Sequence, residues 1–418
     1  MPLVAPFVGA VRDYRKPPSM ISTFAKNAIV LGLLTAMGPL AIDMYLPALP
    51  AIAVDLRAGT AATQMTLTAF FLAFGLCQMV YGPVSDMVGR KPPLYFGLTL
   101  FTLGSIGCAV APGIEWLIFF RFVQGLGASA AMAIPRAIIR DLHTGVEAAR
   151  LMALVMLVFS VAPILAPLSG SALIVPFGWR AVFVATAMLS ALGFLLVAVF
   201  LPETRPPGSR VTIGFGHALS GFGRLLRDGR FLGLTFIGGL GMSSFFAFLA
   251  SSSFIYMDHF GLTPTQYSFA FSVNAIGFIG ASQFAAKLGV RFGMARVVNA
   301  AVWSYAVFSL ILFGVIAAGV DSLPVLIVLL VPAFASLGLV IPSTMVLALE
   351  DHGRIAGMAS SLGGTFQMVT GGIMIVIVSL FFDGTALPMV TTIALCAMGA
   401  LILSFLTLIR APAVKPSE

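Results

Sequence analysis

Charged residues are scarce in this chain. Only 9% of its 418 residues are Asp, Glu, Lys or Arg, whereas 59% are hydrophobic and the mean hydropathy is +1.06. A soluble domain carries about 25% charged residues, so this chain has too few polar groups to cover a surface that faces water. We therefore expect lipid to be its solvent, with no room for a large soluble domain.

Residues that commonly carry enzyme chemistry are also scarce. The three cysteines, Cys77, Cys108 and Cys396, fall in apolar runs and have neither metal-ligand spacing nor the pattern of a disulfide framework. The four histidines are scattered over predicted loops and form no cluster with cysteines or acids. The phosphate-binding Gly-Lys-Ser/Thr sequence is absent, so ATP is not expected to supply energy. The sequence thus predicts no enzyme, no cofactor and no metal.

What the chain has instead is a series of long apolar runs. At about 20 residues for each transmembrane helix, its length holds roughly a dozen spans. We predict an all-α membrane protein with twelve transmembrane helices, at residues 25–47, 61–83, 93–111, 116–140, 151–175, 181–201, 231–256, 266–287, 296–319, 323–349, 356–381 and 387–409. The first run is long enough to span, so it is expected to be a retained helix and not a cleaved signal.

One polar stretch divides these runs into two sets of six. Residues 202–230 contain two adjacent prolines and five arginines. We expect an N-terminal bundle at 25–201, this segment as a cytoplasmic linker, and a C-terminal bundle at 231–410. Cytoplasmic tails are expected at 1–24 and 411–418.

The basic residues are distributed unevenly about these spans. Of the 23 Lys and Arg residues, 19 fall on one side of the predicted membrane. Arg57 and Arg180 fall on the other side, and Arg121 and Arg136 lie within a span. Because cytoplasmic loops carry an excess of Lys and Arg, both termini are predicted to be cytoplasmic. The net charge of +8 then follows from topology and attraction to anionic lipid, without a nucleic-acid partner.

A short charged connector joins the second and third apolar runs. Residues 82–91 read Gly-Pro-Val-Ser-Asp-Met-Val-Gly-Arg-Lys. Gly82 and Gly89 are expected to allow close backbone approach and positive φ, and Pro83 to mark a helix end. The run resembles the signature loop of the major facilitator superfamily, with Gly82, Asp86, Gly89, Arg90 and Lys91 at the family's spacing.

That resemblance implies a conformational latch at the cytoplasmic face. Asp86 would cap a helix of the second half, and Arg90 would pair with Asp141 near the end of the fourth span. Charge pairs there would stabilise one of two rocking states, whereas the alternative is a solvated turn. A weaker repeat of the connector, from Arg291 to Arg296, follows the eighth span. Two six-helix halves related by such a repeat are the layout of this superfamily.

Two charged residues of opposite sign lie inside predicted spans. Asp43 is 16 residues, or about 24 Å, into the first span, and Arg121 is about 8 Å from the outer end of the fourth. An ionised carboxylate in hydrocarbon costs roughly 2.5–3.5 kcal/mol, and proton uptake relieves that cost. Because buried charges are usually paired or line water-filled cavities, we expect Asp43 and Arg121 to share one polar pocket, directly or through water. Proton coupling is the predicted role, and a static structural pair is the alternative.

Further motifs resemble those of drug exporters. The run from Arg121 to Ala128 resembles the superfamily's fourth-helix motif, whose arginine is associated with proton coupling in the drug-exporter branch. Residues 136–142, and Asp43 in its Met-Tyr-Leu-Pro setting, resemble the Bcr/CflA branch of drug:proton antiporters. Pro163 and Pro167 belong to a run similar to an antiporter motif, although Ala166 replaces its glycine. These prolines predict a kinked fifth helix.

The substrate cavity is predicted from polar and adaptable apolar side chains inside spans. Phe and Met are plentiful, which suits a promiscuous cavity and equally suits a core or lipid contact. The candidate cavity residues are Tyr45, Gln124, Met242, Phe246, Asn274 and Gln367.

The resemblance therefore implies a proton-coupled antiporter that exports small amphipathic drugs, such as chloramphenicol-like or bicyclomycin-like compounds, by alternating access. It would act as a monomer in the bacterial inner membrane, with protons, a small molecule and lipid as its partners. A proton-linked importer or a facilitator of a metabolite on the same fold is the alternative. A receptor or membrane-embedded enzyme would need a sensing domain or a catalytic cluster, and neither is visible.

Overall fold

The regular secondary structure of the described residues is all helical. The computed structural model describes residues 18–206, 208 and 215–409, and these residues contain twelve helices long and apolar enough to cross a membrane. The predicted all-α fold with twelve spans is confirmed. Most of the expected N-terminal tail, and the C-terminal tail 411–418, lie outside the described residues.

Eight helical elements form the first half. They are α1 Pro18–Asp43, the short 3-10 helix η1 Leu46–Ala48, α2 Leu49–Asp55, α3 Thr60–Val88, α4 Lys91–Ala109, α5 Ile114–Leu142, α6 Gly145–Phe177 and α7 Arg180–Phe200.

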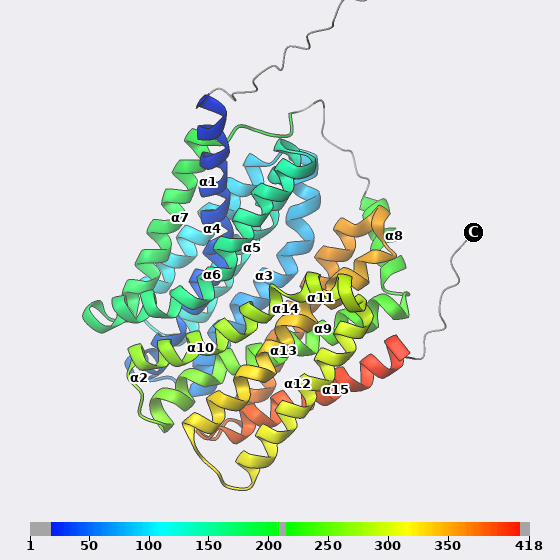
Figure 1. The fold of residues 1–418 in the computed structure, drawn as a ribbon. Helices are drawn as coiled ribbons and strands as arrows, with labels where there is room; N and C mark the ends of the chain where they lie inside the picture. The colour runs from blue at the N-terminus through cyan, green and yellow to red at the C-terminus, as the bar shows by residue number, and fades with distance from the viewer. Residues whose placement is uncertain (1–17, 207, 209–214, 410–418) are drawn as a thin grey trace, which may run out of the picture.

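The second half follows the linker. It contains α8 Phe215–Leu225, α9 Gly229–Phe254, η3 Ile255–His259, α10 Pro264–Ser282, α11 Ala285–Phe292, α12 Met294–Ala317, α13 Leu323–Glu350, η4 Gly353–Ile355, α14 Ala356–Phe381, α15 Leu387–Ser404 and η5 Phe405–Ile409. Figure 1 shows the two halves lying at an angle to each other, with α8 beside the first turns of α14.

The first crossing is broken at Asp43. The prediction of one span over 25–47 is wrong at its end, because α1 stops at Asp43 and the chain continues through η1 and α2 to Asp55. Pro47 and Pro50 follow the break. Proline lacks an amide donor and restricts the residue before it, so α1 cannot continue unchanged through this segment. Asp43 is therefore the last residue of a helix, within a longer crossing than expected.

The eighth crossing is broken as well. The predicted span 266–287 is divided between α10, which ends at Ser282, and α11, which begins at Ala285. No proline or glycine stands at this break, so no local pattern predicts it.

The connector at residues 82–91 is mostly helical, contrary to the predicted turn. Pro83 lies inside α3, which continues to Val88, so it does not end the helix. Prolines are tolerated in membrane helices when neighbouring groups satisfy the freed backbone. A side chain at Gly82 would meet no atom within 4 Å, so the expected close approach is absent there. Gly89 does have positive φ, at 103°, and makes the turn into α4.

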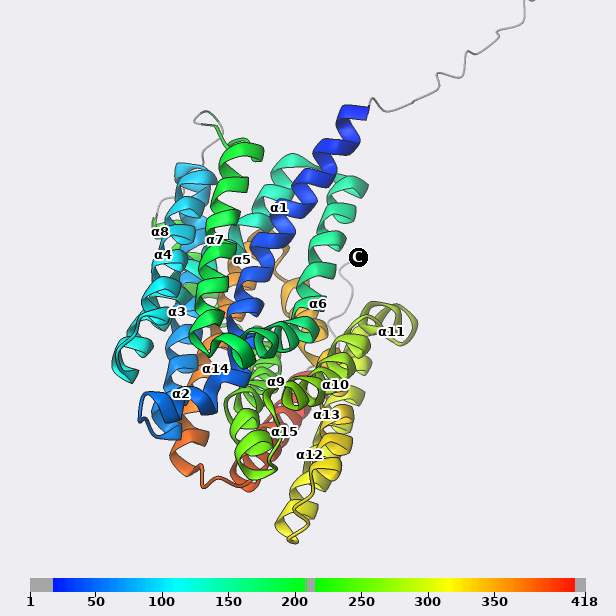
Figure 2. The same cartoon turned by 90° about the vertical axis from the view of Figure 1, so that its left-hand side faces the viewer.

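The two halves meet mainly through α3 against α14 and α6 against α10. Gln64 donates to the carbonyl of Ala250 at 2.9 Å and accepts from Ser379 at 2.5 Å. Ser253 donates to the carbonyl of Leu46 at 2.7 Å. These residues lie near the helix ends that face away from the linker, and Figure 2 shows α2 and the first part of α10 on that same side.

The opposite ends of the helices carry most of the Lys and Arg residues, and we call them the basic face. Its ion pairs stay within one half or join that half to the linker. Arg90 pairs with Asp141 in the first half, and Arg230 pairs with Asp351 in the second. No ion pair among the described residues links α1–α7 to α9–α15. The halves are therefore joined away from the basic face.

Candidate functional site

The break after α1 places a carboxylate and a guanidinium in the interior. Asp43 is 5% exposed and Arg121, in the first part of α5, is 0% exposed. Buried ionisable groups in a membrane protein are costly and therefore mark functional positions. The sequence predicted both as the central charged residues.

Arg121 is held by backbone, amide and aromatic groups. Its Nη1 donates to the carbonyl oxygen of Ala41 at 3.0 Å and to Oε1 of Gln124 at 2.6 Å. The guanidinium lies 4.6 Å from the ring centroid of Tyr45 and 4.5 Å from that of Phe70. Such cation–π contacts are strongest where the cation is desolvated. The two rings therefore hold the plane of the guanidinium, and the Ala41 carbonyl and Gln124 hold its Nη1.

The rest of the guanidinium is left without partners. Nε and Nη2 of Arg121 are buried and have no hydrogen-bond acceptor among the described residues. Buried polar groups are nearly always satisfied, so two empty donors on one buried cation are unusual. They suit a group that changes partners during a functional cycle.

Asp43 and Arg121 do not form a direct ion pair, which was one of the two arrangements that the sequence left open. No ion pair joins the two residues, which are both within the described part of the chain. Asp43 lies three residues before η1, which contacts α9 and α10 of the second half. Arg121 instead binds the backbone at Ala41, in the last turn of α1. That the two side chains share one polar pocket stays a prediction.

Tyr267 of α10 lies close to the contact between the halves at η1. Its hydroxyl lies 3.1 Å from Oγ of Ser252 in α9. The neighbouring Ser253 donates to the carbonyl of Leu46 in η1. The sequence did not predict Tyr267 or the two serines as site residues, because no local pattern relates them to η1, which lies more than 200 positions earlier.

Of the candidate cavity residues, Tyr45 and Gln124 join the Arg121 cluster. The Tyr45 hydroxyl lies 2.8 Å from Oγ1 of Thr66. Gln124 donates through Nε2 to Oγ of Ser105 at 2.7 Å, while its Oε1 accepts from Arg121. Both side chains are 0% exposed, so here they support Arg121 and line no open space.

The other four candidates lie apart from that cluster. Phe246 stacks on Phe71 across the two halves, with ring centroids 3.9 Å apart. Asn274 donates to the carbonyl of Ala270 at 3.2 Å, and its Oδ1 is buried without a partner among the described residues. Met242 and Gln367 are partly exposed residues of α9 and α14. The structure does not bring the six together around one cavity.

The latch residues form a charge cluster at the basic face of the first half. Arg90 is 3% exposed, and its Nε lies 2.7 Å from Oδ2 of Asp141. The pair implied by the resemblance is thus present. Burial acts to lower the pKa of Arg90, but the hydrogen bond to Asp141 and the charges of Asp86 and Asp141 together raise it above its ordinary value.

Asp86 does not cap a helix of the second half, contrary to expectation. Its Oδ1 lies 2.8 Å from Nη1 of Arg90 and 2.5 Å from Nη1 of Arg205, at the start of the linker. The physical reason is the arrangement of the halves, since the basic face has no ion pair between them among the described residues. In this arrangement the linker supplies the partner of Asp86.

Glu203 is a member of the cluster that the sequence did not reveal. Its carboxylate accepts from the backbone amides of Arg90 at 2.9 Å and Lys91 at 3.0 Å. These amides begin α4, where a negative charge is favourable. Glu203 therefore fixes the turn at Gly89 to the end of the first half.

The prolines of α6 lie where the two halves touch. Pro163 and Pro167 are inside one continuous helix, and Figure 2 shows that α6 is bent. Ser268 and Ser272 of α10 donate to the carbonyls of Pro167 at 2.8 Å and Ile164 at 2.9 Å. Both serines also donate to carbonyls of their own helix, so these hydroxyls bridge α6 and α10.

This architecture defines a class of protein. Two six-helix halves, joined by a linker and enclosing unneutralised buried charges, are the arrangement of a secondary transporter. Residues 31–375 match the Major Facilitator Superfamily, and the chain belongs to that family. It is therefore a multi-pass transporter of the bacterial inner membrane, and its family and fold are not those of an enzyme.

Individual relatives agree with this placement. The chain is 35% identical to the uncharacterized MFS-type transporter YdgK of Bacillus subtilis, over 87% of this chain and 90% of the relative. It is 29% identical to a bicyclomycin resistance protein homolog of Haemophilus influenzae, over 88% of this chain and 93% of the relative. The crystal structure of a D-xylose-proton symporter shares its fold, with a TM-score of 0.73 and 14% identity over 95% of this chain and 99% of that one.

Proposed function

We propose that this transporter is a proton-coupled antiporter that exports small amphipathic drugs by alternating access. The observation that carries the proposal is the burial of the Asp43 carboxyl group at a helix break close to the second half. This group has no ion-pair partner among the described residues. A carboxylate in such a place is stable when protonated and costly when ionised. It can therefore bind and release a proton as its surroundings change.

The contacts between the halves support an inward-facing arrangement. The side-chain hydrogen bonds at Leu46, Gln64 and Ser253 hold the halves together away from the basic face. The excess of Lys and Arg marks the basic face as cytoplasmic. Asp43 is then closed off from the outer side, and proton release is expected toward the cytoplasm.

The proposed cycle uses Asp43 and Arg121 in turn. With the halves apart at the cytoplasmic face, drug enters and Asp43 gives up its proton. The unused donors of Arg121 are available to stabilise the resulting carboxylate. When the halves rock, Asp43 is reprotonated from outside, and drug leaves. One proton moving inward across 100 mV releases about 2.3 kcal/mol, which supports a drug concentration ratio of about fifty.

The similarity to a bicyclomycin resistance protein homolog supports a drug as the substrate. The proposed class includes bicyclomycin-like and chloramphenicol-like compounds. The proposed unit is a monomer, because each chain contains both halves of the site.

The test is drug accumulation in bacterial cells that lack their own pumps. Cells that express the chain are expected to hold several-fold less drug than cells with an empty vector, and a protonophore should remove the difference. If the chain raised accumulation, it would be an importer. If accumulation were unchanged for every drug tried, drug export would be contradicted.

A further inference from the structure

A groove of about 610 Å³ opens on the second half, between α10, α11, α12 and α13. Helix α13 packs against both α10 and α12, but these two helices have little contact with each other. The groove lies in the space between them, and small residues of α13, including Ala335 and Ser336, form its floor. The main packing partners of α12 are α11, α13 and α15, all in the second half, so we expect the groove to open away from the first half and toward lipid.

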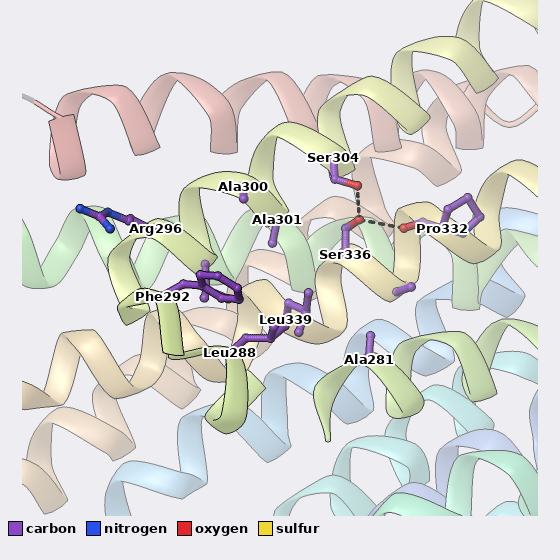
Figure 3. A pocket seen from close by; sticks show the side chains of 12 residues that line it. Ala281, Leu288, Phe292, Arg296, Ala300, Ala301, Ser304, Pro332, Ser336 and Leu339 are labelled. Atoms are coloured by element: carbon purple, nitrogen blue, oxygen red, sulfur yellow. Dashed lines mark hydrogen bonds between the residues drawn. The ribbon is translucent and has the colours of Figure 1, made fainter. Parts of the chain in front are cut away.

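One end of the groove is basic and the other is closed by a satisfied polar pair. Figure 3 shows Arg296 at one end, with its guanidinium directed away from the apolar lining, and Ser304 and Ser336 at the other. Ser336 donates to Oγ of Ser304 and to the carbonyl of Pro332, both at 2.8 Å. Between these ends the lining is apolar, and the helix rise from residue 296 to 304 makes it about 12 Å long. The groove thus suits an alkyl chain with a polar group at its basic end.

The charge at the mouth is positive and unneutralised. Arg296 has no ion-pair partner among the described residues. Lys287 and Arg291 lie on the adjacent α11, and no acid occurs between residues 285 and 296. At the end of α13, Asp351 forms its ion pair with Arg230. Glu350, the other acid there, forms no ion pair with Lys287, Arg291 or Arg296 among the described residues. Such a cluster has the charge that attracts an anionic headgroup.

The first half differs at the corresponding place. There Arg90, after the turn at Gly89, is neutralised by Asp86 and Asp141. In the internal repeat, Gly293 stands where Gly89 does and is followed by Met294. The second half therefore has no carboxylate that pairs with Lys287, Arg291 or Arg296 in the way that Asp86 and Asp141 pair with Arg90 among the described residues.

We infer that this groove is a binding site for an anionic phospholipid of the leaflet at the basic face. One acyl chain lies over Ala335 and Leu339, and the phosphate lies at Arg296. The exposed apolar side chains of Phe284, Val290 and Phe292 extend the lipid-facing surface along α11. The occupant would brace α11 against α12 and α13 and fill the gap that α10 and α12 leave.

Native mass spectrometry of the detergent-purified full chain tests this site. The probes are phosphatidylglycerol and phosphatidylcholine with identical acyl chains. Wild type should bind phosphatidylglycerol roughly fivefold more tightly than phosphatidylcholine. Arg296→Gln should remove that preference, and Arg227→Gln, a matched charge change on the linker outside the groove, should leave it intact.

A second variant tests the apolar part. Ala335→Phe should fill the floor and weaken the binding of both lipids to the groove, in protein whose thermal transition shows that it is folded. Equal affinity of wild type for the two lipids would overturn the inference. So would an equal loss of preference in Arg296→Gln and Arg227→Gln, because the preference would then come from overall charge. These outcomes are independent of any drug transport.

Discussion

Asp43 and Arg121 are charges placed where lipid and protein exclude water, and no ion pair among the described residues neutralises either one. Arg121 is fixed along one edge by Ala41, Gln124 and two aromatic rings, and two of its donors are empty. Asp43 lies three residues before η1, which contacts α9 and α10 of the other half. A structural pair would have combined the two charges, so their separation favours exchange of partners over a static role.

The planar guanidinium of Arg121 should not be replaceable by a lysine ammonium. Its Nη1 donates hydrogen bonds to both the Ala41 carbonyl and Gln124, while the plane of the group lies over the rings of Tyr45 and Phe70. A point charge on a flexible stem cannot reproduce these contacts together. Arg121→Lys is therefore expected to lower drug export about tenfold or more, measured as accumulation in pump-deficient cells at matched expression.

Arg140→Lys is the matched control, since Arg140 is an exposed residue later in the same helix. It should export drug as wild type does. Full activity of Arg121→Lys would show that charge alone suffices at this position.

At the residue scale, the sequence predicted isolated charges better than it predicted their partners. Asp43, Arg121 and the Arg90–Asp141 pair were recognisable because charge is rare in this chain and the motifs are dense. Tyr267 and Ser253 were not, because both are ordinary residues of apolar helices. The contact of Ser253 with Leu46 exists only once the two halves pack.

At the scale of elements, the break between α1 and α2 depends on close packing by α6. A Cβ added to Gly170 would lie 2.2 Å from the carbonyl oxygen of Met44, directly after Asp43. That oxygen belongs to the backbone and cannot rotate away, so the helix must shift. Gly170 thus allows α6 to lie against the broken segment.

Gly170→Ala is expected to destabilise the protein by about 1–3 kcal/mol, the usual cost of overpacking. The measurement is the thermal transition of the purified chain in detergent. The control is Gly82→Ala, which adds the same methyl group inside a helix where nothing lies within 4 Å. Its transition should be unchanged or slightly higher, because alanine favours helix more than glycine does. Equal transitions for both variants would mean that contact with Met44 is unimportant.

Hydropathy predicted the helices themselves but not their interruptions. The span predicted at 356–381 coincides with α14, whereas the spans at 25–47 and 266–287 each cross a break. Apolar character continues through both breaks, so a hydropathy window does not register them. Pro47 and Pro50 were a usable signal for the first break, but the second, at Gln283 and Phe284, depends on how α11 packs onto α12 and α13.

At the scale of the whole molecule, the two faces have different roles. Hydrogen bonds join the halves on the side away from the basic face, and ion pairs at the basic face stay within each half or reach the linker. Alternating access requires the first set to break when the outer side opens. The bond from Ser253 to the carbonyl of Leu46 is one of those contacts.

A crosslink across that contact should stop transport. Cysteines at Leu46 and Ser253, in a chain whose Cys77, Cys108 and Cys396 are replaced, should join through a short reversible crosslinker. Drug export should fall to background when the crosslink forms and recover after it is cleaved. If crosslinked protein still exported drug, transport would not require the halves to separate at Leu46 and Ser253.

The matched control is a cysteine pair at Asp55 and Arg180. These residues form an ion pair 2.6 Å long on the same face, but both belong to the first half. Their crosslink should leave export unchanged, because no movement between the halves strains it.

The most direct test of the account measures proton coupling at Asp43 in sealed vesicles. Wild type and Asp43→Asn are reconstituted, a pH gradient is imposed, and drug movement is followed together with proton flux. We predict that wild type drives drug against its gradient with opposing proton flux, and that Asp43→Asn only equilibrates drug and carries no coupled protons. Uphill drug transport by Asp43→Asn at the wild-type rate would contradict the account.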